Sequence, residues 1–238
     1  DFQITDEAAD VSRLLAPVEP KAIYGIGLNY TSHVAEMNQE TPSRLVIFMK
    51  SPGSVQDPTA PINLPVYLPS REVDYEGELA VIISRPCKNA TVETAMSYVL
   101  GFTCANDVSA RDWQYQYGGG QFVKGKSFDT FCPLGPCLAT QDTIPDAQNL
   151  KIKTILNNAI VQEASTAEMT FSIPEIIAFL SGSCTLPAGA VILTGTPAGS
   201  GIRSEPLRYL KAGDQVSVEI DGIGTLTNPV YEEVIDAE

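Results

Sequence analysis

Apolar residues occur along this chain in short runs that are separated by glycine, proline and polar residues. Several runs are rich in β-branched side chains and predict strands: 22–27, 45–50, 79–83, 100–105 and 191–193. We expect the runs at 45–50, 79–83 and 191–193 to be buried. Two other stretches, 150–156 and 216–220, alternate apolar and polar residues as half-exposed strands do, and Asp221-Gly222 predicts a hairpin turn after the second.

Helical spacing is rarer. Residues 29–37 and 91–99 predict short helices. The sequence Ser-Ile-Pro-Glu at 172–175 is a capping box with proline in the first turn, and it predicts a helix that stops near Gly182. Residues 115–129, which include three consecutive glycines, predict a loop that is either a mobile active-site flap or a plain linker.

These elements predict a β-rich mixed α/β fold with a few short helices. We expect residues 21–238 to form one domain, preceded by an N-terminal segment, 1–20, that contains a short amphipathic piece. The chain begins abruptly at Asp1, so an upstream segment is expected to have been trimmed.

The charge balance narrows the class of partner. The 29 acidic residues outnumber the 15 basic residues and give a formal net charge of −14, which argues against nucleic acid and anionic membranes as partners. A small anionic substrate would therefore need a local positive centre, either a metal ion or a few placed cations.

Cysteine usage and hydropathy indicate the compartment. The five cysteines are scattered and include no C-x-x-C pair, so we expect free thiols in a reducing environment. No apolar run approaches the 18 residues of a membrane span, and the N-terminus does not have the pattern of a signal peptide. The expectation is an intracellular protein, cytoplasmic or mitochondrial.

Acidic residues gather at the start of one predicted strand. Asp74, Glu76 and Glu78 alternate with other residues, so on a strand they would lie on one side. Crowded carboxylates repel one another unless a cation lies among them, and Mg²⁺, Mn²⁺ and Ca²⁺ prefer oxygen ligands. A solvated acidic strand start is the alternative. Asp107 directly follows the run at 100–105, and its carboxylate joins the others if the two strands are antiparallel neighbours.

His33 is the only histidine in the chain. Glu36 follows it by three residues, so on a helix the two side chains share a face and could touch. A carboxylate that holds an imidazole fixes its tautomer and strengthens it as a base. An exposed helix face with two unrelated polar residues is the alternative, and this pattern alone favours it.

Two other stretches offer groups for an anion. Lys126 is either a surface charge or, in a carboxylate-rich site, a cation that holds a substrate oxyanion. Residues 194–199, Thr-Gly-Thr-Pro-Ala-Gly, offer hydroxyls and backbone amides to an anion, or they form only a tight turn.

Taken together, these motifs resemble the fumarylacetoacetate hydrolase family, in its small single-domain branch. The resemblance runs from about residue 20 to the C-terminus and is carried, in the family's order, by Gly-Leu-Asn-Tyr at 27–30 with His33 and Glu36, and by the stretches 74–80, 106–114, 125–130, 194–199 and 224–228. One departure is Pro-Ala-Gly-Ala at 187–190, where the family commonly has an acidic residue.

The resemblance implies a mostly antiparallel mixed β-sheet roll, usually a homodimer, that binds Mg²⁺ or Mn²⁺, with Ca²⁺ as a substitute. The implied ligands are Glu76, Glu78 and Asp107. The implied catalytic residues are Lys126 beside the metal and the lid residues His33 and Glu36, which activate a water; the implied substrate-binding residues are Gln114 and Thr196.

Substrates of this family are small 2-oxo and 1,3-diketo acids, so the first functional expectation is a metal-dependent hydrolase that cleaves a C–C bond in an acylpyruvate-like acid. The alternative is an oxaloacetate keto–enol tautomerase or decarboxylase that uses the same site. A non-catalytic binding module is a third class, and the intact set of acids, lysine and histidine argues against it.

Overall fold

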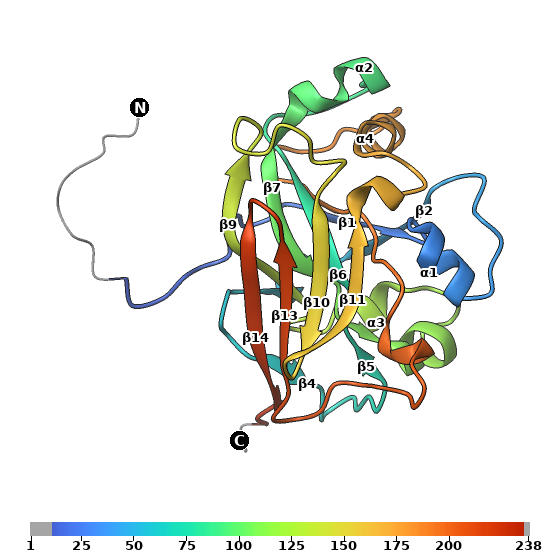
Figure 1. The fold of residues 1–238 in the computed structure, drawn as a ribbon, viewed down its shortest axis with the longest axis vertical. Coiled ribbons are helices and arrows are strands. Elements are labelled where there is room, and N and C mark those ends of the chain that lie inside the picture. Colours follow the sequence, from blue (N-terminus) through green and yellow to red (C-terminus); the bar gives the residue numbers. More distant parts are fainter. Residues whose placement is uncertain (1–10, 236–238) are drawn as a thin grey trace.

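The computed structural model describes residues 11–235 and places two β-sheets against each other (Figure 1). The larger sheet has the strand order β2-β1-β12-β6-β7-β9-β3. The bounds of its strands are β1 Ile23–Gly27, β2 Val46–Lys50, β3 Val55–Gln56, β6 Gly77–Ile83, β7 Val99–Asn106, β9 Cys132–Thr140 and β12 Val191–Leu193.

The smaller sheet has the order β11-β10-β13-β14-β4, and a separate two-stranded sheet pairs β5 with β8. The bounds are β4 Ile62–Leu64, β5 Val73–Asp74, β8 Ser109–Ala110, β10 Lys151–Leu156, β11 Ala159–Ser165, β13 Gln215–Ile220 and β14 Gly224–Glu232. Most neighbours are antiparallel; the parallel pairs are β1–β12, β3–β9 and β4–β14. The predicted mostly antiparallel mixed sheet is therefore confirmed.

Strand β6 is the centre of the larger sheet, and all of its residues are buried. Because side chains alternate along a strand, Leu79 and Val81 point to one face and pack in the main core with Ile152 and Val218 of the smaller sheet. Ala80 and Ile82 lie in a second apolar cluster on the other face. A strand covered on both faces reads as a continuous apolar run, which is why this element was evident from the sequence.

The helices are short and lie around the sheets. They are α1 Thr31–Glu36, α2 Val92–Ala95, α3 Val123–Lys126 and α4 Ile173–Ser181, with a π-helical turn at Trp113–Tyr117 and 3₁₀ turns at Pro52–Ser54, Met96–Tyr98, Thr166–Glu168 and Gly201–Arg203. Helix α4 begins with the predicted capping box, in which Glu175 accepts hydrogen bonds from both the amide and the hydroxyl of Ser172.

Three sequence expectations need correction. The run at 45–50 is not a fully buried strand: β2 is at the edge of the sheet, and Ile47 and Met49 are exposed while Phe48 and Lys50 are buried. The predicted helix at 91–99 is only a turn of α-helix followed by a 3₁₀ turn, because Val99 already belongs to β7.

The predicted loop at 115–129 contains helical turns on both sides of its glycines, since the π-helical turn precedes them and α3 follows. Of the N-terminal segment, residues 1–10 lie outside the described residues. The amphipathic piece that follows forms no regular element, and Val11, Leu14 and Leu15 are exposed.

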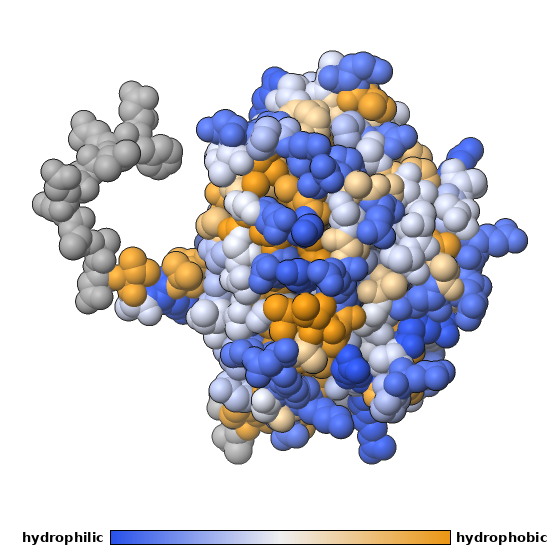
Figure 2. All heavy atoms as spheres, viewed as in Figure 1, coloured by the Kyte–Doolittle hydropathy of each residue, from blue (hydrophilic) through white to orange (hydrophobic). Residues whose placement is uncertain are grey.

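The outer face of the smaller sheet mixes polar and apolar side chains, as Figure 2 shows over β10, β13 and β14. This mixture agrees with the alternation that predicted half-exposed strands at 150–156 and 216–220. All five cysteines have free thiols, as expected. Within residues 11–235, no helix has both the length and the apolar character that a membrane crossing requires.

Because β6 is central and buried, a cavity made there should lower the stability of the protein. Leu79→Ala should lower the free energy of unfolding by about 2–5 kcal/mol, because the side chain is fully buried between the sheets. The matched control Leu207→Ala removes an exposed leucine and should change it by less than about 0.5 kcal/mol. Urea denaturation of both variants measures the difference; equal losses would contradict the core assigned here.

Candidate active site

Three carboxylates converge where β6 and β7 meet. The strands are antiparallel with Gly77 opposite Asn106, so Glu76, just before β6, and Glu78, within it, lie beside Asp107, which follows β7. Oxygen atoms of these three side chains lie within 4.8 Å of one another, and all three residues are buried. The sequence expectation that the two strands bring these acids together is correct.

Asp74 does not join this group. It belongs to β5, and the chain bends away between β5 and β6. Its Oδ1 accepts a hydrogen bond of 2.7 Å from the amide of Gly201, and its Oδ2 accepts one of 2.9 Å from Nε of Arg111. Asp74 therefore orients Arg111 and the turn at Gly201–Arg203, and the expected row of three aligned acids is reduced to two.

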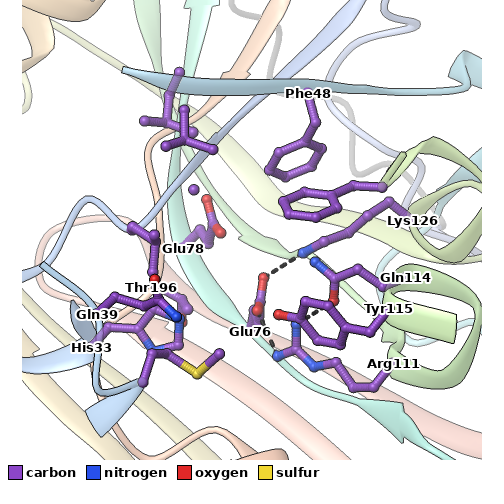
Figure 3. Close-up of a pocket in the computed structure, with 16 residues that line it drawn as sticks. His33, Gln39, Phe48, Glu76, Glu78, Arg111, Gln114, Tyr115, Lys126 and Thr196 are labelled. Carbon is purple, nitrogen blue, oxygen red and sulfur yellow. Dashed lines mark hydrogen bonds and ion pairs between the residues drawn. The ribbon is translucent and has the colours of Figure 1, made fainter. Parts of the chain in front are cut away.

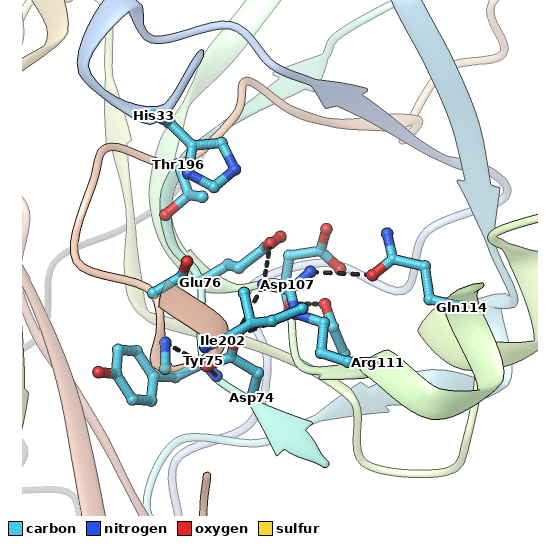
Figure 4. A network of polar contacts seen from close by, with 12 residues as sticks. His33, Asp74, Tyr75, Glu76, Asp107, Arg111, Gln114, Thr196 and Ile202 are labelled. Atoms are coloured by element: carbon cyan, nitrogen blue, oxygen red, sulfur yellow. Dashed lines mark hydrogen bonds and ion pairs between the residues drawn. The ribbon is translucent and has the colours of Figure 1, made fainter. Parts of the chain in front are cut away.

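Buried cations are fixed among the acids, and Figure 4 shows one of them, Arg111, beside Asp74 and Glu76. Nζ of Lys126 lies 2.6 Å from Oε2 of Glu76 and 2.6 Å from Oδ2 of Asp107. Nη2 of Arg111 lies 2.6 Å from Oε1 of Glu76. Nζ of Lys50 donates at 2.5 Å to Oδ1 of Asp107 and at 3.1 Å to the carbonyl of Val108. The surface-charge alternative for Lys126 is therefore wrong, because the residue is 2% exposed.

The buried charges do not balance. Four carboxyl groups face three cations, namely Asp74, Glu76, Glu78 and Asp107 against Lys50, Arg111 and Lys126. Glu78 is the carboxyl without an ion pair. Burial raises its pKa well above the usual value, and the charges of Asp107 and Glu76 raise it further. For Glu76, burial acts in the same direction, but Arg111 and Lys126 outweigh it and lower the pKa.

This donor set fits a divalent cation. Carboxylate oxygens are the ligands that Mg²⁺, Mn²⁺ and Ca²⁺ prefer, and a bound cation would offset the repulsion that raises the pKa of Glu78. Glu76, Glu78 and Asp107 are the residues that would hold it. The backbone amide of Gly195 donates a 2.6 Å hydrogen bond to Oε2 of Glu78 and fixes the direction of that carboxylate.

His33 and Glu36 touch, so the interpretation of an exposed face with unrelated side chains is wrong. Nδ1 of His33 lies 3.0 Å from Oε1 of Glu36, and His33 is buried. Oε2 of Glu36 accepts a 2.7 Å bond from the amide of Gly199, and Oε1 accepts one of 3.0 Å from the hydroxyl of Ser200. Burial opposes ionisation of Glu36, but these hydrogen bonds and the imidazole lower its pKa.

The turn at 194–199 serves the protein's own carboxylates. Its amides at Gly195 and Gly199 bind Glu78 and Glu36, as described above. The hydroxyl of Thr196 donates at 3.0 Å to the carbonyl of Gly77 and accepts at 2.8 Å from Nε2 of Gln162. The turn therefore connects the His33–Glu36 pair to the start of β6 through hydrogen bonds.

One pocket of about 210 Å³ unites these groups. Among the residues that line it are six of the eight site residues predicted from the sequence: His33, Glu76, Glu78, Gln114, Lys126 and Thr196. Asp107 lies behind the wall with no exposed surface, and Glu36 acts from behind His33. In Figure 3, His33 and Thr196 lie on one side of Glu76, and Lys126 and Gln114 lie on the other.

Sequence reasoning gave no role to Lys50 or Arg111. Arg111 holds Asp74, Glu76 and Gln114 together, the last through a 2.9 Å bond from Nη1 to Oε1. A signal for Lys50 was present: on a strand it shares a side with Phe48, an inward apolar residue, two positions before it.

Comparison with known proteins identifies relatives along most of the chain. Residues 22–231 match the family model described as fumarylacetoacetate (FAA) hydrolase C-terminal. The mitochondrial oxaloacetate tautomerase fahd2 of Xenopus laevis is 47% identical over 218 residues, which cover 91% of this chain and 68% of that protein.

Solved structures with the same fold are named for different activities. A fumarylacetoacetate hydrolase from Exiguobacterium antarcticum has a TM-score of 0.87 and 40% identity, covering 95% of this chain and 80% of that one. A 5-carboxymethyl-2-hydroxymuconate delta-isomerase from Mycobacterium smegmatis has a TM-score of 0.82 and 39% identity, covering 94% and 83%.

The unpaired carboxylate predicts a metal-dependent stability. Mg²⁺ or Mn²⁺ at a hundred times its dissociation constant should stabilise the protein by about 2.7 kcal/mol, because only the folded chain assembles the three ligands. Glu78→Gln should abolish this gain without destabilising the metal-free protein, since it removes the uncompensated charge. Glu219→Gln on the exposed side of β13 should keep the gain. Thermal denaturation with and without metal checks this; full metal stabilisation of Glu78→Gln would refute the ligand set.

Unlike removal of the Glu78 charge, removal of the Lys50 charge is expected to destabilise the protein. Lys50→Met leaves one oxygen of Asp107 without its buried cation and should lower the unfolding free energy by about 3–5 kcal/mol. Lys153→Met breaks a partly exposed pair of 3.5 Å with Glu219 and should cost less than about 1 kcal/mol. Urea titration compares the two, and similar small losses would show that Lys50 is dispensable to the site.

Proposed function

Since this chain belongs to the fumarylacetoacetate hydrolase family, we propose that it is a metal-dependent oxaloacetate keto–enol tautomerase. Support comes from the name of its curated relative and from one geometric observation. His33, which Glu36 contacts from behind, and the Lys126 cation line one pocket with the carboxylates Glu76 and Glu78 between them. A substrate bound through a metal ion at these carboxylates would thus have a base on one side and a cation on the other.

The proton chemistry rests on His33. Glu36 is ionised near neutral pH because its pKa is lowered, so it accepts a hydrogen bond from Nδ1–H of His33. The second ring nitrogen, Nε2, is then the basic atom available to the pocket. During ketonisation, the O–H bond at C2 of the enol breaks and a C–H bond forms at C3. Nε2 of His33 accepts the proton that the enol oxygen releases through water and delivers it to C3, so His33 ends the step as it began and no co-reactant is needed.

The cations stabilise the oxygen of the substrate as it becomes negative. A bound Mg²⁺ or Mn²⁺ would supply Lewis-acid polarisation of the oxo group. Lys126 places a fixed ammonium beside the same position, and the loss of one such donor typically lowers kcat by about 10²–10³. Gln114, which Arg111 holds through its Oε1, retains its amide N–H groups to donate to a substrate carboxylate.

C–C bond hydrolysis, the first expectation from the sequence, uses the same His33 to activate water. The tautomerase is preferred because the relative that is 47% identical is named for that reaction. Decarboxylation of oxaloacetate, which the sequence analysis grouped with tautomerisation, is a further candidate reaction of the same site. A homodimer is also proposed from the family resemblance, and a mitochondrial or cytoplasmic location is proposed from the mitochondrial relative.

The test follows the ultraviolet absorbance of enol-oxaloacetate. Purified protein with Mg²⁺ should accelerate its loss over buffer. His33→Gln should lower kcat by about 10²–10⁴, the range for a general acid–base residue. Glu205→Gln, at an exposed position in the segment after β12, is the control and should retain full activity.

Product analysis by proton NMR separates the alternatives. Faster ketonisation without pyruvate supports the tautomerase, whereas pyruvate from oxaloacetate indicates a decarboxylase. Cleavage of an acylpyruvate to pyruvate and a free acid, with the enol decay unchanged, would overturn the proposal and establish the hydrolase.

A further inference from the structure

One side of the active-site pocket is aromatic. Phe48 of β2, Phe122 before α3 and Tyr115 of the π-helical turn form a continuous row, which we call the aromatic wall. The ring centroids of Phe48 and Phe122 are 6.0 Å apart with planes at 62°, and those of Tyr115 and Phe122 are 6.1 Å apart at 77°. These are edge-to-face contacts, which hold aromatic rings in defined orientations.

The position of Phe48 is set by a glycine on the neighbouring strand. Gly25 of β1 lies opposite Phe48 in the sheet, and a Cβ at Gly25 would be 2.2 Å from the ring. The ring therefore lies directly over the backbone of β1. Nζ of Lys126 is 4.8 Å from the ring centroid, so the wall begins beside the cation that is proposed to hold the substrate oxygen.

The charge distribution decides what the wall can receive. The permanently charged cations among the described lining residues are Lys126 and Arg111, and both are bound to buried carboxylates. A carboxylate against the wall would lose water without gaining a partner, which is unfavourable, whereas an uncharged ring would gain apolar and aromatic contacts. The second carboxylate of oxaloacetate is accordingly placed on the other side, towards His33 and Gln39 (Figure 3).

We propose that this pocket also interconverts the keto and enol forms of arylpyruvates, 2-oxo acids with a flat aromatic ring on C3, with that ring packed on the aromatic wall. The inference rests on the proposed tautomerase chemistry and extends its substrate class. The bond changes are the same: O–H at C2 breaks, C–H at C3 forms, and no co-reactant is consumed. Apolar side chains of Ile26 and Val46 continue the surface that the substituent would meet.

The experiment uses the full chain with Mg²⁺ and measures ketonisation of enol-phenylpyruvate and enol-oxaloacetate in parallel. The wild-type protein should accelerate both, and phenylpyruvate should inhibit oxaloacetate turnover competitively. Phe48→Leu and Phe122→Leu should each lower the ratio of kcat/KM for phenylpyruvate to that for oxaloacetate by about tenfold. Two separate variants are used because Phe48 also packs on β1 and its loss could impair folding.

Phe179→Leu is the matched control, because this phenylalanine is half exposed on α4 and lies outside the pocket; the ratio should not change. Acceleration of oxaloacetate alone, with no inhibition by phenylpyruvate, would overturn the inference and leave the proposed function intact. Acceleration of phenylpyruvate alone would overturn the proposed substrate instead. A ratio that neither wall variant changes would show that the aromatic wall does not select the substituent.

Discussion

The constraint on which the rest of this structure depends is the burial of four carboxyl groups with three cations. Taking charges out of water is costly, and the cost is met only when partners are placed within hydrogen-bonding distance. Lys50, Arg111 and Lys126 come from three different segments, so the edge strand β2, the segment after β8 and helix α3 must all be in position before the acids are compensated. The charge cluster thereby couples the assembly of the fold to the assembly of the site.

The same cluster explains why the four acids differ in their charge partners. Asp74 and Glu76 share Arg111, Asp107 lies between two lysines, and Glu78 has only a backbone amide. One carboxylate is therefore left to interact with an added cation, next to two others whose direction is already fixed. Carboxylates held this way would need little reorganisation to bind a cation.

The buried carboxylates lie between two sides of the pocket, one polar and one aromatic. The turn at 194–199 binds both Glu36 and Glu78, so it fixes the His33–Glu36 pair relative to the buried carboxylates. The aromatic side is built from β2 and from the helical turns that flank the glycines at 118–120. In the proposed reaction, these polar and aromatic sides would let one proton-transfer chemistry act on 2-oxo acids with different substituents.

The sequence by itself determined the elements whose signal is local. The apolar run of β6, the alternation in β10 and β13, and the capping box of α4 each follow from spacing along a few residues. The convergence of Glu76, Glu78 and Asp107 was expected only on the condition that their two strands are antiparallel neighbours, and the fold met that condition. Only the tertiary structure decided the partners. Lys50 and Asp107 are 57 positions apart, Arg111 and Asp74 are 37 apart, and Phe48 and Phe122 meet from distant segments. Such contacts leave no periodic trace, because they depend on how complete elements pack and not on the residues beside them.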